Sequence, residues 1–331
     1  MAQAGLQADV RVLFGQPTLA SLAAAVSTGQ VVEVPANRIP PDCQRITPAM
    51  LPLVELDQDS IDRVVACIPG GAANVQDIYP LAPLQEGLLY HHMTAARDPY
   101  QQHALFAFAR REDLDAFALA LQAVIESHDI LRTSLVWDVL EQPLQVVWRQ
   151  ARLTVQEWQA GPGGHVAERL REHFDPQHNP LDIRQAPMLA LAWAEDRANG
   201  RWIGLLRFHH LVNDATSTAV LLAEIAAHVQ GRQASLAPAY AYRDYVARTR
   251  QGQAAHKAFF EAGLGTVDEP TLAFELQERP GEHLDLQHAS GLLEAELGQR
   301  LRTQVRQLGV SAASLFHLAW ALVLGLSLIH I

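Results

Sequence analysis

The sequence predicts an α/β fold, because stretches of strand character alternate with stretches of helical character along most of the chain. Bulky apolar residues at 202–208 are typical of a buried strand, and Val220, Leu221, Ile225 and Val229 follow at helical spacing. With 331 residues, of which 49% are hydrophobic, the chain can bury a core in one large or two smaller domains. The other expected elements are strands at 103–110, 131–137 and 188–195 and helices at 113–127, 166–173, 216–230, 259–263 and 297–308.

Charge and cysteine content exclude several classes of protein. The formal net charge is −11 with only 25 basic residues, which argues against a nucleic-acid partner. The two cysteines, Cys43 and Cys67, provide no disulfide framework, and no signal peptide opens the chain. We therefore expect a cytoplasmic protein.

One apolar stretch, 312–331, has no formally charged residue and reaches the roughly 20 residues that a membrane helix needs. Ser314 and His317 lie within it, so a core helix of a soluble protein is the preferred interpretation. We expect no membrane partner, although such a helix exposes apolar surface if its neighbours are missing.

The N-terminal residues predict a helix followed by a stiff connector. Pro17 and Thr18 precede an alanine-rich amphipathic turn, which is a favourable helix start. Five prolines between positions 35 and 52 forbid a continuous helix and stiffen the chain. We expect 29–74 to be a semi-rigid linker that includes one short helix at 59–67.

The segment 208–217, FHHLVNDATS, lies where the strand at 202–208 gives way to a helix. Successive side chains of a strand point to opposite faces, so His209 and His210 cannot both face one cavity. One is expected to be buried and the other to be functional, since an imidazole exchanges protons near neutral pH. Asp214, just before the helix, is placed to cap its free backbone N–H groups.

Two other interpretations of this segment compete with catalysis. A histidine pair is by itself more often structural than catalytic, and His210 with Asp214 could ligate zinc. We expect no metal, because adjacent strand histidines diverge and the sequence has no HExxH or paired CxxC spacing that would supply further ligands.

Four motifs in order resemble those of the condensation domains of nonribosomal peptide synthetases. Residues 209–215 resemble the core motif HHxxxDG, and also the HxxxD motif of the wider chloramphenicol-acetyltransferase-like acyltransferases. Residues 78–90 (IYPLAPLQEGLLY), 127–135 (SHDILRTSL) and 242–247 (YRDYVA) are similar to the first, second and fourth core motifs, the last without its tryptophan.

The resemblance implies a role for each polar residue of these motifs. His210 is the active-site histidine and His209 its scaffold neighbour, while Asp214 pairs with an arginine and holds the loop. Ala215 replaces the family's glycine; if that position needs a positive φ, the methyl group costs about 1 kcal/mol and puts activity in question. Arg132 is expected to be a buried ion-pair partner.

A second histidine pair begins the segment 91–98, HHMTAARD. It is similar to the HH[I/L]xxxxGD motif of the dual epimerisation and condensation subgroup, although it is one residue shorter, has Met93 at the aliphatic position and lacks the glycine before Asp98. The subgroup resemblance assigns His91, His92 and Asp98 to inversion of the donor's α-carbon, and 175–187 is typical of the same branch. The alternative is plain condensation, with both histidines on a helix surface.

The resemblance also implies a domain order. Residues 1–28 look like the end of a peptidyl carrier domain, 29–74 a linker, 75–265 a complete first acetyltransferase-like lobe, 266–325 the start of a truncated second lobe, and 326–331 a tail that departs from the family pattern. No carrier GGxS motif occurs, so we expect no directly bound cofactor. Substrates would arrive on the 4′-phosphopantetheine of upstream and downstream carrier domains, loaded by an adenylation domain.

The implied function is amide bond formation between carrier-bound aminoacyl or peptidyl thioesters, with the 331 residues inactive by themselves because the second lobe is incomplete. Two alternatives stay open. One is a freestanding acyltransferase that uses a soluble thioester, which the carrier-like stretch at 9–26 disfavours. The other is a noncatalytic docking module.

Overall fold

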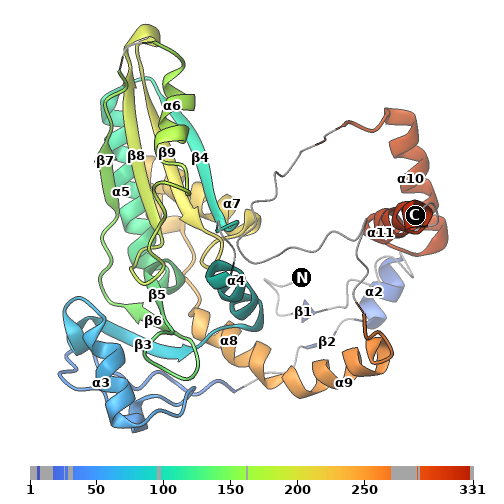
Figure 1. Ribbon diagram of the computed structural model, residues 1–331, viewed down its shortest axis with the longest axis horizontal. Helices are drawn as coiled ribbons and strands as arrows, with labels where there is room; N and C mark the ends of the chain where they lie inside the picture. The colour runs from blue at the N-terminus through green and yellow to red at the C-terminus, as the bar shows by residue number, and fades with distance from the viewer. Residues whose placement is uncertain are drawn as a thin grey trace. The chain divides into compact units, whose positions relative to one another are not determined.

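The computed structural model describes residues 6–7, 18–25, 27–28, 33–94, 98–161, 163–269, 289 and 291–328. It divides into two compact units, Val34–Phe259 on the one hand and Met1–Glu33 with Phe260–Ile331 on the other (Figure 1). Strands and helices are mixed as the sequence predicted, and the α/β class is confirmed.

The larger unit is built on a four-stranded sheet in the order β4-β9-β8-β7. β4 (Gln101–Phe108) and β8 (Leu189–Asp196) flank β9 (Arg201–His209), and both pair with it in antiparallel fashion. β7 (Thr154–Glu157) joins β8 in parallel. The three longest strands lie within two residues of the positions that the sequence predicted, whereas β7 was not predicted.

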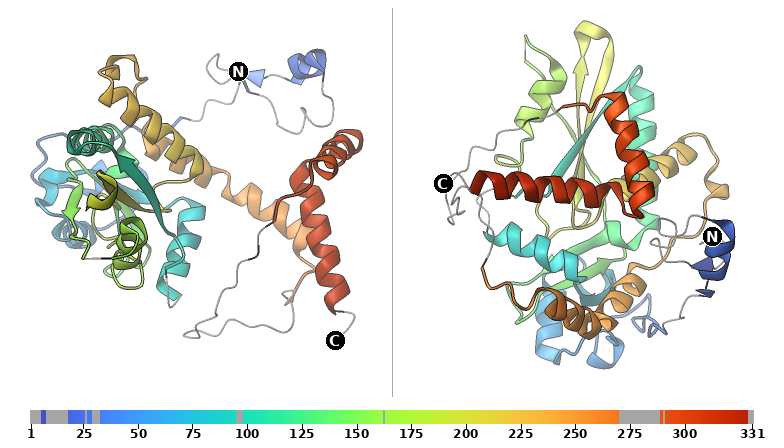
Figure 2. Two further views of the ribbon diagram at one scale, coloured as in Figure 1. Left: turned by 90° about the horizontal axis from the view of Figure 1, so that it is seen from above. Right: turned by 90° about the vertical axis from the view of Figure 1, so that its right-hand side faces the viewer.

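Different helices cover the two faces of this sheet (Figures 1 and 2). Leu191 and Leu206 pack into the main core beneath α5 (Arg111–Ser127) and α7 (Ala215–Val229). The neighbouring side chains Ala192 and Leu205 point to the other face, where they form a separate cluster with α6 (Val166–His173). This alternation follows from the period of two along a strand, and it also governs the two histidines at the end of β9.

A smaller antiparallel sheet has the order β3-β6-β5. β3 (Val75–Pro80), β5 (Thr133–Val136) and β6 (Leu144–Trp148) are buried along most of their length. β5 is shorter than the expected strand at 131–137, because residues 129–132 form a 3₁₀ turn. α8 (Tyr242–Gln251) and α9 (Gln253–Leu264) follow α7 along the chain.

The segment 34–74 is part of the folded unit, in contrast to the linker expected at 29–74. α3 (Gln58–Ala66) occurs at the predicted position and buries Ile61 and Val64, while Ile39 and Ile46 join the same hydrophobic core as the larger sheet. The prolines prevent a long helix but not burial, because apolar residues between them can still pack. The larger compact unit begins at Val34, and the domain boundary expected at 75 stays a prediction.

The other unit contains short elements at its N-terminal end. α2 (Leu19–Ala25) begins where the sequence predicted, since the Thr18 hydroxyl accepts a hydrogen bond from the backbone N–H of Ser21 at 3.1 Å. β1 (Leu6–Gln7) pairs with β2 (Ser27–Thr28). Whether 1–28 is a carrier remnant stays a prediction.

Two helices form the C-terminal part of that unit, α10 (Ala295–Leu308) and α11 (Ala312–Leu328). Among the described residues no single helix is long and apolar enough to cross a membrane, and only the pair Ala295–Leu308 and Ala312–Leu326, bent by 105°, passes that test together. Of the region expected to open a second lobe, 266–325, residues 270–288 and 290 lie outside the described residues, as do the last three residues of the expected tail.

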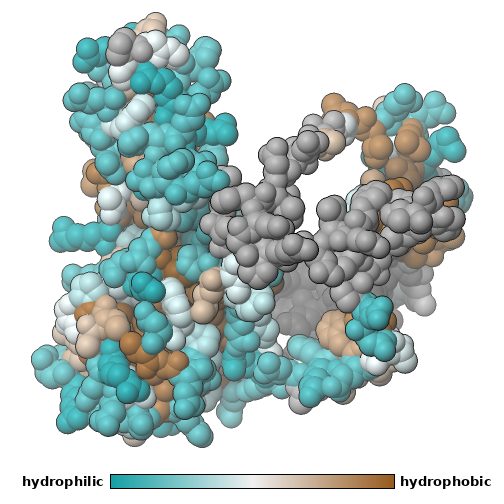
Figure 3. Space-filling model, viewed as in Figure 1, coloured by the Kyte–Doolittle hydropathy of each residue, from teal (hydrophilic) through white to brown (hydrophobic). Residues whose placement is uncertain are grey.

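The two ends of β9 have different surroundings. At the Arg201 end, exposed Glu195 and Arg197 give the hairpin a predominantly hydrophilic surface (Figure 3). At the His209 end, the strand meets α4 (Pro83–Thr94), the residues that precede β4, and the loop to α7. The two histidine pairs singled out from the sequence lie at this second end.

Candidate active site

Strand register brings distant segments together where β9 ends. Gln101, the first residue of β4, lies opposite His209, the last residue of β9. The residues just before β4 are therefore neighbours of the loop 210–214. α4 also ends here, with His91 and His92 in its last turn.

His209 is fully buried, with an exposed fraction of 0%. Its Nδ1 accepts a hydrogen bond from the backbone N–H of Leu211 at 3.1 Å, so the proton of the neutral ring lies on Nε2. That nitrogen is 2.8 Å from Asp98 Oδ2 and donates to it, because a carboxylate can only accept. His209 is thus the buried member of the pair, as the strand period predicted for one of the two.

His210 is exposed and has the opposite tautomer. Its Nδ1 lies 2.7 Å from the carbonyl oxygen of Asn213, which can only accept, so Nδ1 carries the proton of the neutral ring. Its backbone N–H donates to the carbonyl of Tyr100 at 2.9 Å. Nε2 forms no hydrogen bond within the part of the chain that the structure describes, and its lone pair is available to a substrate.

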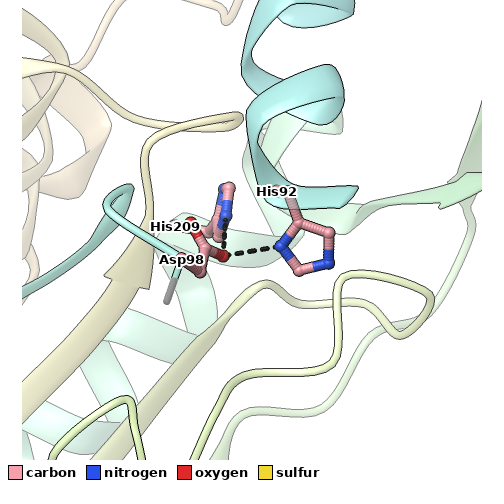
Figure 4. Close-up of side chains that lie close together, drawn as sticks. All are labelled: His92, Asp98 and His209. Carbon is pink, nitrogen blue, oxygen red and sulfur yellow. Dashed lines mark hydrogen bonds and ion pairs between the residues drawn. The ribbon is translucent and has the colours of Figure 1, made fainter. Parts of the chain in front are cut away.

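Asp98 links one histidine of each pair, His92 and His209, as Figure 4 shows. Its Oδ2 accepts from His92 Nδ1 at 2.7 Å as well as from His209, and its Oδ1 accepts from the backbone N–H of Tyr100 at 2.9 Å. Burial raises the pKa of Asp98, but the hydrogen bonds from His209, His92 and Tyr100 outweigh it and hold that pKa well below its usual range. The sequence predicted two separate motifs, and the structure unites them through this carboxylate.

Tyr100 is a site residue that the sequence reasoning missed. Its hydroxyl lies 2.6 Å from His91 Nδ1, and its ring stacks against those of His91 and His210. The only sequence signal was its place two residues after Asp98, at the start of a strand. That position indicates a role in the site only once the register between β4 and β9 is known.

Asp214 caps α7 and does not form the expected ion pair. Its Oδ1 accepts from the backbone N–H of Ser217 at 2.7 Å, and this hydrogen bonding lowers the pKa of Asp214. No arginine pairs with it among the residues placed by the structure. Ala215 is the first residue of α7, so its φ is helical and the penalty expected for the missing glycine does not arise.

Arg132 lies in the core away from this cluster and is held by neutral acceptors. Its Nη1 donates to the Gln76 side chain at 2.8 Å and to the carbonyl of Trp148. Burial lowers the pKa of Arg132, and the charge of Asp129 partly offsets that effect. Within the described ranges no carboxylate forms a direct ion pair with Arg132, in contrast to the expectation. Its side chain instead connects β3 and β6 by hydrogen bonds to Gln76 and Trp148.

Three atoms of the cluster could act as metal ligands. His92 Nδ1, Asp98 Oδ2 and His209 Nε2 all lie within 4.8 Å of one another, and zinc accepts such nitrogen and oxygen ligands. Each of these atoms already takes part in a hydrogen bond of the cluster. No further histidine, cysteine or carboxylate of the described chain joins this group, whereas a structural zinc site has four ligands. The absence of a metal stays a prediction.

Comparison with known proteins gives a consistent result. The family model described as "Condensation domain" matches residues 75–326. Malpinin synthetase and malpibaldin synthetase of Mortierella alpina are each 43% identical to the chain over 324 residues, which is 97% of the chain but 4% and 6% of those proteins. A linear gramicidin synthase chain of Brevibacillus parabrevis is 28% identical over 306 residues, 88% of the chain and 6% of that protein. The chain thus spans a small part of these relatives.

A solved structure shares the fold. The condensation domain from Monacolin K polyketide synthase superimposes with a TM-score of 0.57 and 17% sequence identity, covering 77% of this chain and 60% of that one. At this identity the likeness concerns the fold alone.

Proposed function

The chain belongs to the condensation-domain family, and from that premise we propose that it forms amide bonds between aminoacyl or peptidyl thioesters. The substrates would be carried on the 4′-phosphopantetheine arms of upstream and downstream carrier domains, loaded by an adenylation domain in the cytoplasm. The observation that supports this proposal most directly is the exposed His210 ring with an available Nε2.

In the proposed reaction, the acceptor amine attacks the thioester carbonyl carbon of the donor. A C–N bond forms, the C–S bond breaks, and the proton lost by the amine reaches the departing thiolate. His210 Nε2 accepts this proton or the hydrogen bond that orients the amine, and a positioned base contributes about 100-fold to 10,000-fold. The carbonyl of Asn213 holds the tautomer that this role needs.

We propose in addition that the second histidine pair serves inversion of the donor's α-carbon before condensation. Inversion requires a base to remove the α-proton and an acid to return it on the opposite face. His92 donates through Nδ1 to Asp98, which leaves its Nε2 as an acceptor when the ring is neutral. His91, exposed on the same helical turn, is the second candidate, and Asp98 holds His92 in place.

The condensation proposal is tested with the chain in its natural full-length context. Donor and acceptor carrier domains bearing aminoacyl thioesters are incubated with wild type or His210→Ala, and carrier-bound peptide is followed by mass spectrometry. We expect a loss of about 100-fold or more with His210→Ala. The matched control is His178→Ala, which removes an exposed histidine outside the cluster. Unchanged product with His210→Ala would reject the assignment.

The inversion proposal needs a different readout. In D₂O, deuterium should appear at the donor α-carbon with wild type and should disappear with His91→Ala or His92→Ala. Met93→Ala, an exposed residue on the same helical turn, is the matched control. Persistent exchange in both histidine variants favours plain condensation with His91 and His92 as helix-surface residues.

The same assays separate the alternatives. A freestanding acyltransferase would form product from a soluble pantetheine thioester as readily as from a carrier-bound one. A docking module, in which truncation or Ala215 has abolished turnover, would bind carriers without forming product. Ala215 is the first residue of α7, which leaves truncation as the reason for expecting lost turnover. Assaying residues 1–331 alone tests the expectation that they are inactive by themselves.

A further inference from the structure

Tyr100 contacts three of the residues proposed to act on substrate or to support that action. Its hydroxyl lies 2.6 Å from His91 Nδ1, its carbonyl accepts from the backbone of His210, and its backbone N–H donates to Asp98. The β4–β9 register makes this possible, because Gln101 is paired with His209 and Tyr100 therefore lies beside His210.

The Tyr100 ring lies against both exposed histidines. Its centroid is 5.9 Å from that of His91, with the two planes 7° apart, and 6.4 Å from that of His210, with the planes 24° apart. Both separations fall within the range in which aromatic rings interact. Tyr100 is half-buried, so its ring is a fixed surface against which two solvent-facing imidazoles can rest.

We propose that Tyr100 is a positioning residue for both histidine pairs, and this inference rests on the function proposed above. Its ring fixes the plane of His210 so that Nε2 faces the acceptor amine. Its hydroxyl fixes the ring of His91 for exchange of the donor α-proton. Two separable parts of one side chain thus serve two steps of the reaction.

The ring and the hydroxyl of Tyr100 can have separate roles because different contacts orient His210 and His91. The Asn213 carbonyl fixes one nitrogen of His210, but a single hydrogen bond leaves the ring free to tilt about that contact. Stacking on Tyr100 restricts the tilt. Among the described residues, the ring of His91 forms its hydrogen bond with the phenol oxygen, so its orientation depends on the hydroxyl as well as on stacking.

Two replacements distinguish the two parts. Tyr100→Phe keeps the ring and the backbone contacts but removes the hydroxyl; we expect α-deuterium exchange to fall about fivefold, the loss of one hydrogen bond, and peptide formation to stay within about twofold. Tyr100→Leu removes the ring as well; we expect peptide formation to fall roughly tenfold or more through misplacement of His210, in kcat more than in KM.

Tyr90→Phe is the matched control for the hydroxyl. Tyr90 also places its ring against His91, at 5.8 Å, but its hydroxyl forms no hydrogen bond to that residue in the described structure. We expect both reactions to be unchanged in this variant. Urea midpoints verify that each variant is folded, and Tyr100→Met replaces Tyr100→Leu if the leucine variant does not fold.

The outcomes separate failure of this inference from failure of the proposed function. If His210→Ala abolishes peptide formation while Tyr100→Leu leaves it within twofold, Tyr100 does not position His210. If Tyr100→Phe lowers exchange and peptide formation equally, the residue is merely structural and the inference is wrong. If His210→Ala itself has no effect, the proposed function fails whatever Tyr100 does. If wild type shows no α-deuterium exchange, the proposal that Tyr100 positions His91 is wrong. The proposal that Tyr100 positions His210 is still tested by peptide formation.

Discussion

The two histidine pairs have the same sequence and opposite arrangements. His209 ends a strand and His210 follows it directly; neighbouring side chains diverge by about 180° along a strand, and here one is buried and the other exposed. His91 and His92 end a helix, where neighbours are only about 100° apart, and both reach the residues before β4. The backbone therefore decides whether adjacent histidines share a task. On the strand, His209 supports the structure and His210 is free to act on a substrate. On the helix, His91 and His92 can act together.

The largest expected effect is on stability, and it tests whether His209 is the structural member of the strand pair and His210 is not. His209→Ala should lower the free energy of unfolding by about 2–4 kcal/mol, because it removes a buried ring and a donor to the Asp98 carboxylate. His210→Ala should lower it by less than about 1 kcal/mol, because that ring is exposed. Urea denaturation followed by circular dichroism measures both. Equal losses in the two variants would show that the comparison is wrong.

Acid sensitivity tests the carboxylate that links the two pairs. The pKa of Asp98 is lower in the folded than in the unfolded chain, so its stabilising contribution is complete above about pH 4, near the unfolded value, and is lost as the pH falls below it. Asp98→Asn should be less stable than wild type at pH 7 by about 1–3 kcal/mol, and the gap should narrow below pH 4.

The control for the acid experiment is Asp42→Asn, since Asp42 is exposed and outside the cluster. Its unfolding curve should follow that of wild type from pH 7 to pH 3. A gap between Asp98→Asn and wild type that widens in acid would contradict the direction of the Asp98 shift.

The two histidines of the helix pair, His91 and His92, should differ less in their contributions to stability. His92→Ala should lower the free energy of unfolding by about 1–2 kcal/mol, because a half-buried ring loses its hydrogen bond to a charged carboxylate. His91→Ala should cost less than about 1 kcal/mol, since that ring is exposed. Chemical denaturation under identical conditions compares the two, and a larger loss for His91→Ala would reverse the assignment of Asp98 as the main support.

The smallest expected effect concerns the position where the family has glycine. Ala215→Gly should destabilise α7 by about 0.5–1 kcal/mol, because glycine is a poorer helix former than alanine. Peptide formation should stay within about twofold of wild type. A tenfold gain in rate would show that the methyl group obstructs the loop, despite the helical backbone at this residue.

Much of the larger unit was predictable from local sequence. Apolar spacing alone placed α6 at 166–173, as observed, and β9 and α7 within one residue of each end. The strand period predicted that only one of His209 and His210 would be buried. These features depend on residues within a few positions of one another, so a linear pattern contains the information.

The candidate site needed contacts between residues far apart in the chain. Asp98 and His209 are joined across 111 positions, and Tyr100 meets His210 only because β4 and β9 pair in one register. The burial of Ile39 and Ile46 was equally impossible to predict from local sequence, whereas the cap that Asp214 forms on α7 was predicted.

By itself, then, the sequence determined the positions of several helices and strands, among them β9, α6 and α7, and that only one histidine of the strand pair would be buried, because these features follow from short-range periodicity. Only the tertiary structure decided that two histidine pairs share one carboxylate and one tyrosine. The physical reason is that strand register is selected by packing across the whole sheet, and a one-residue slip would place a different side chain beside His210.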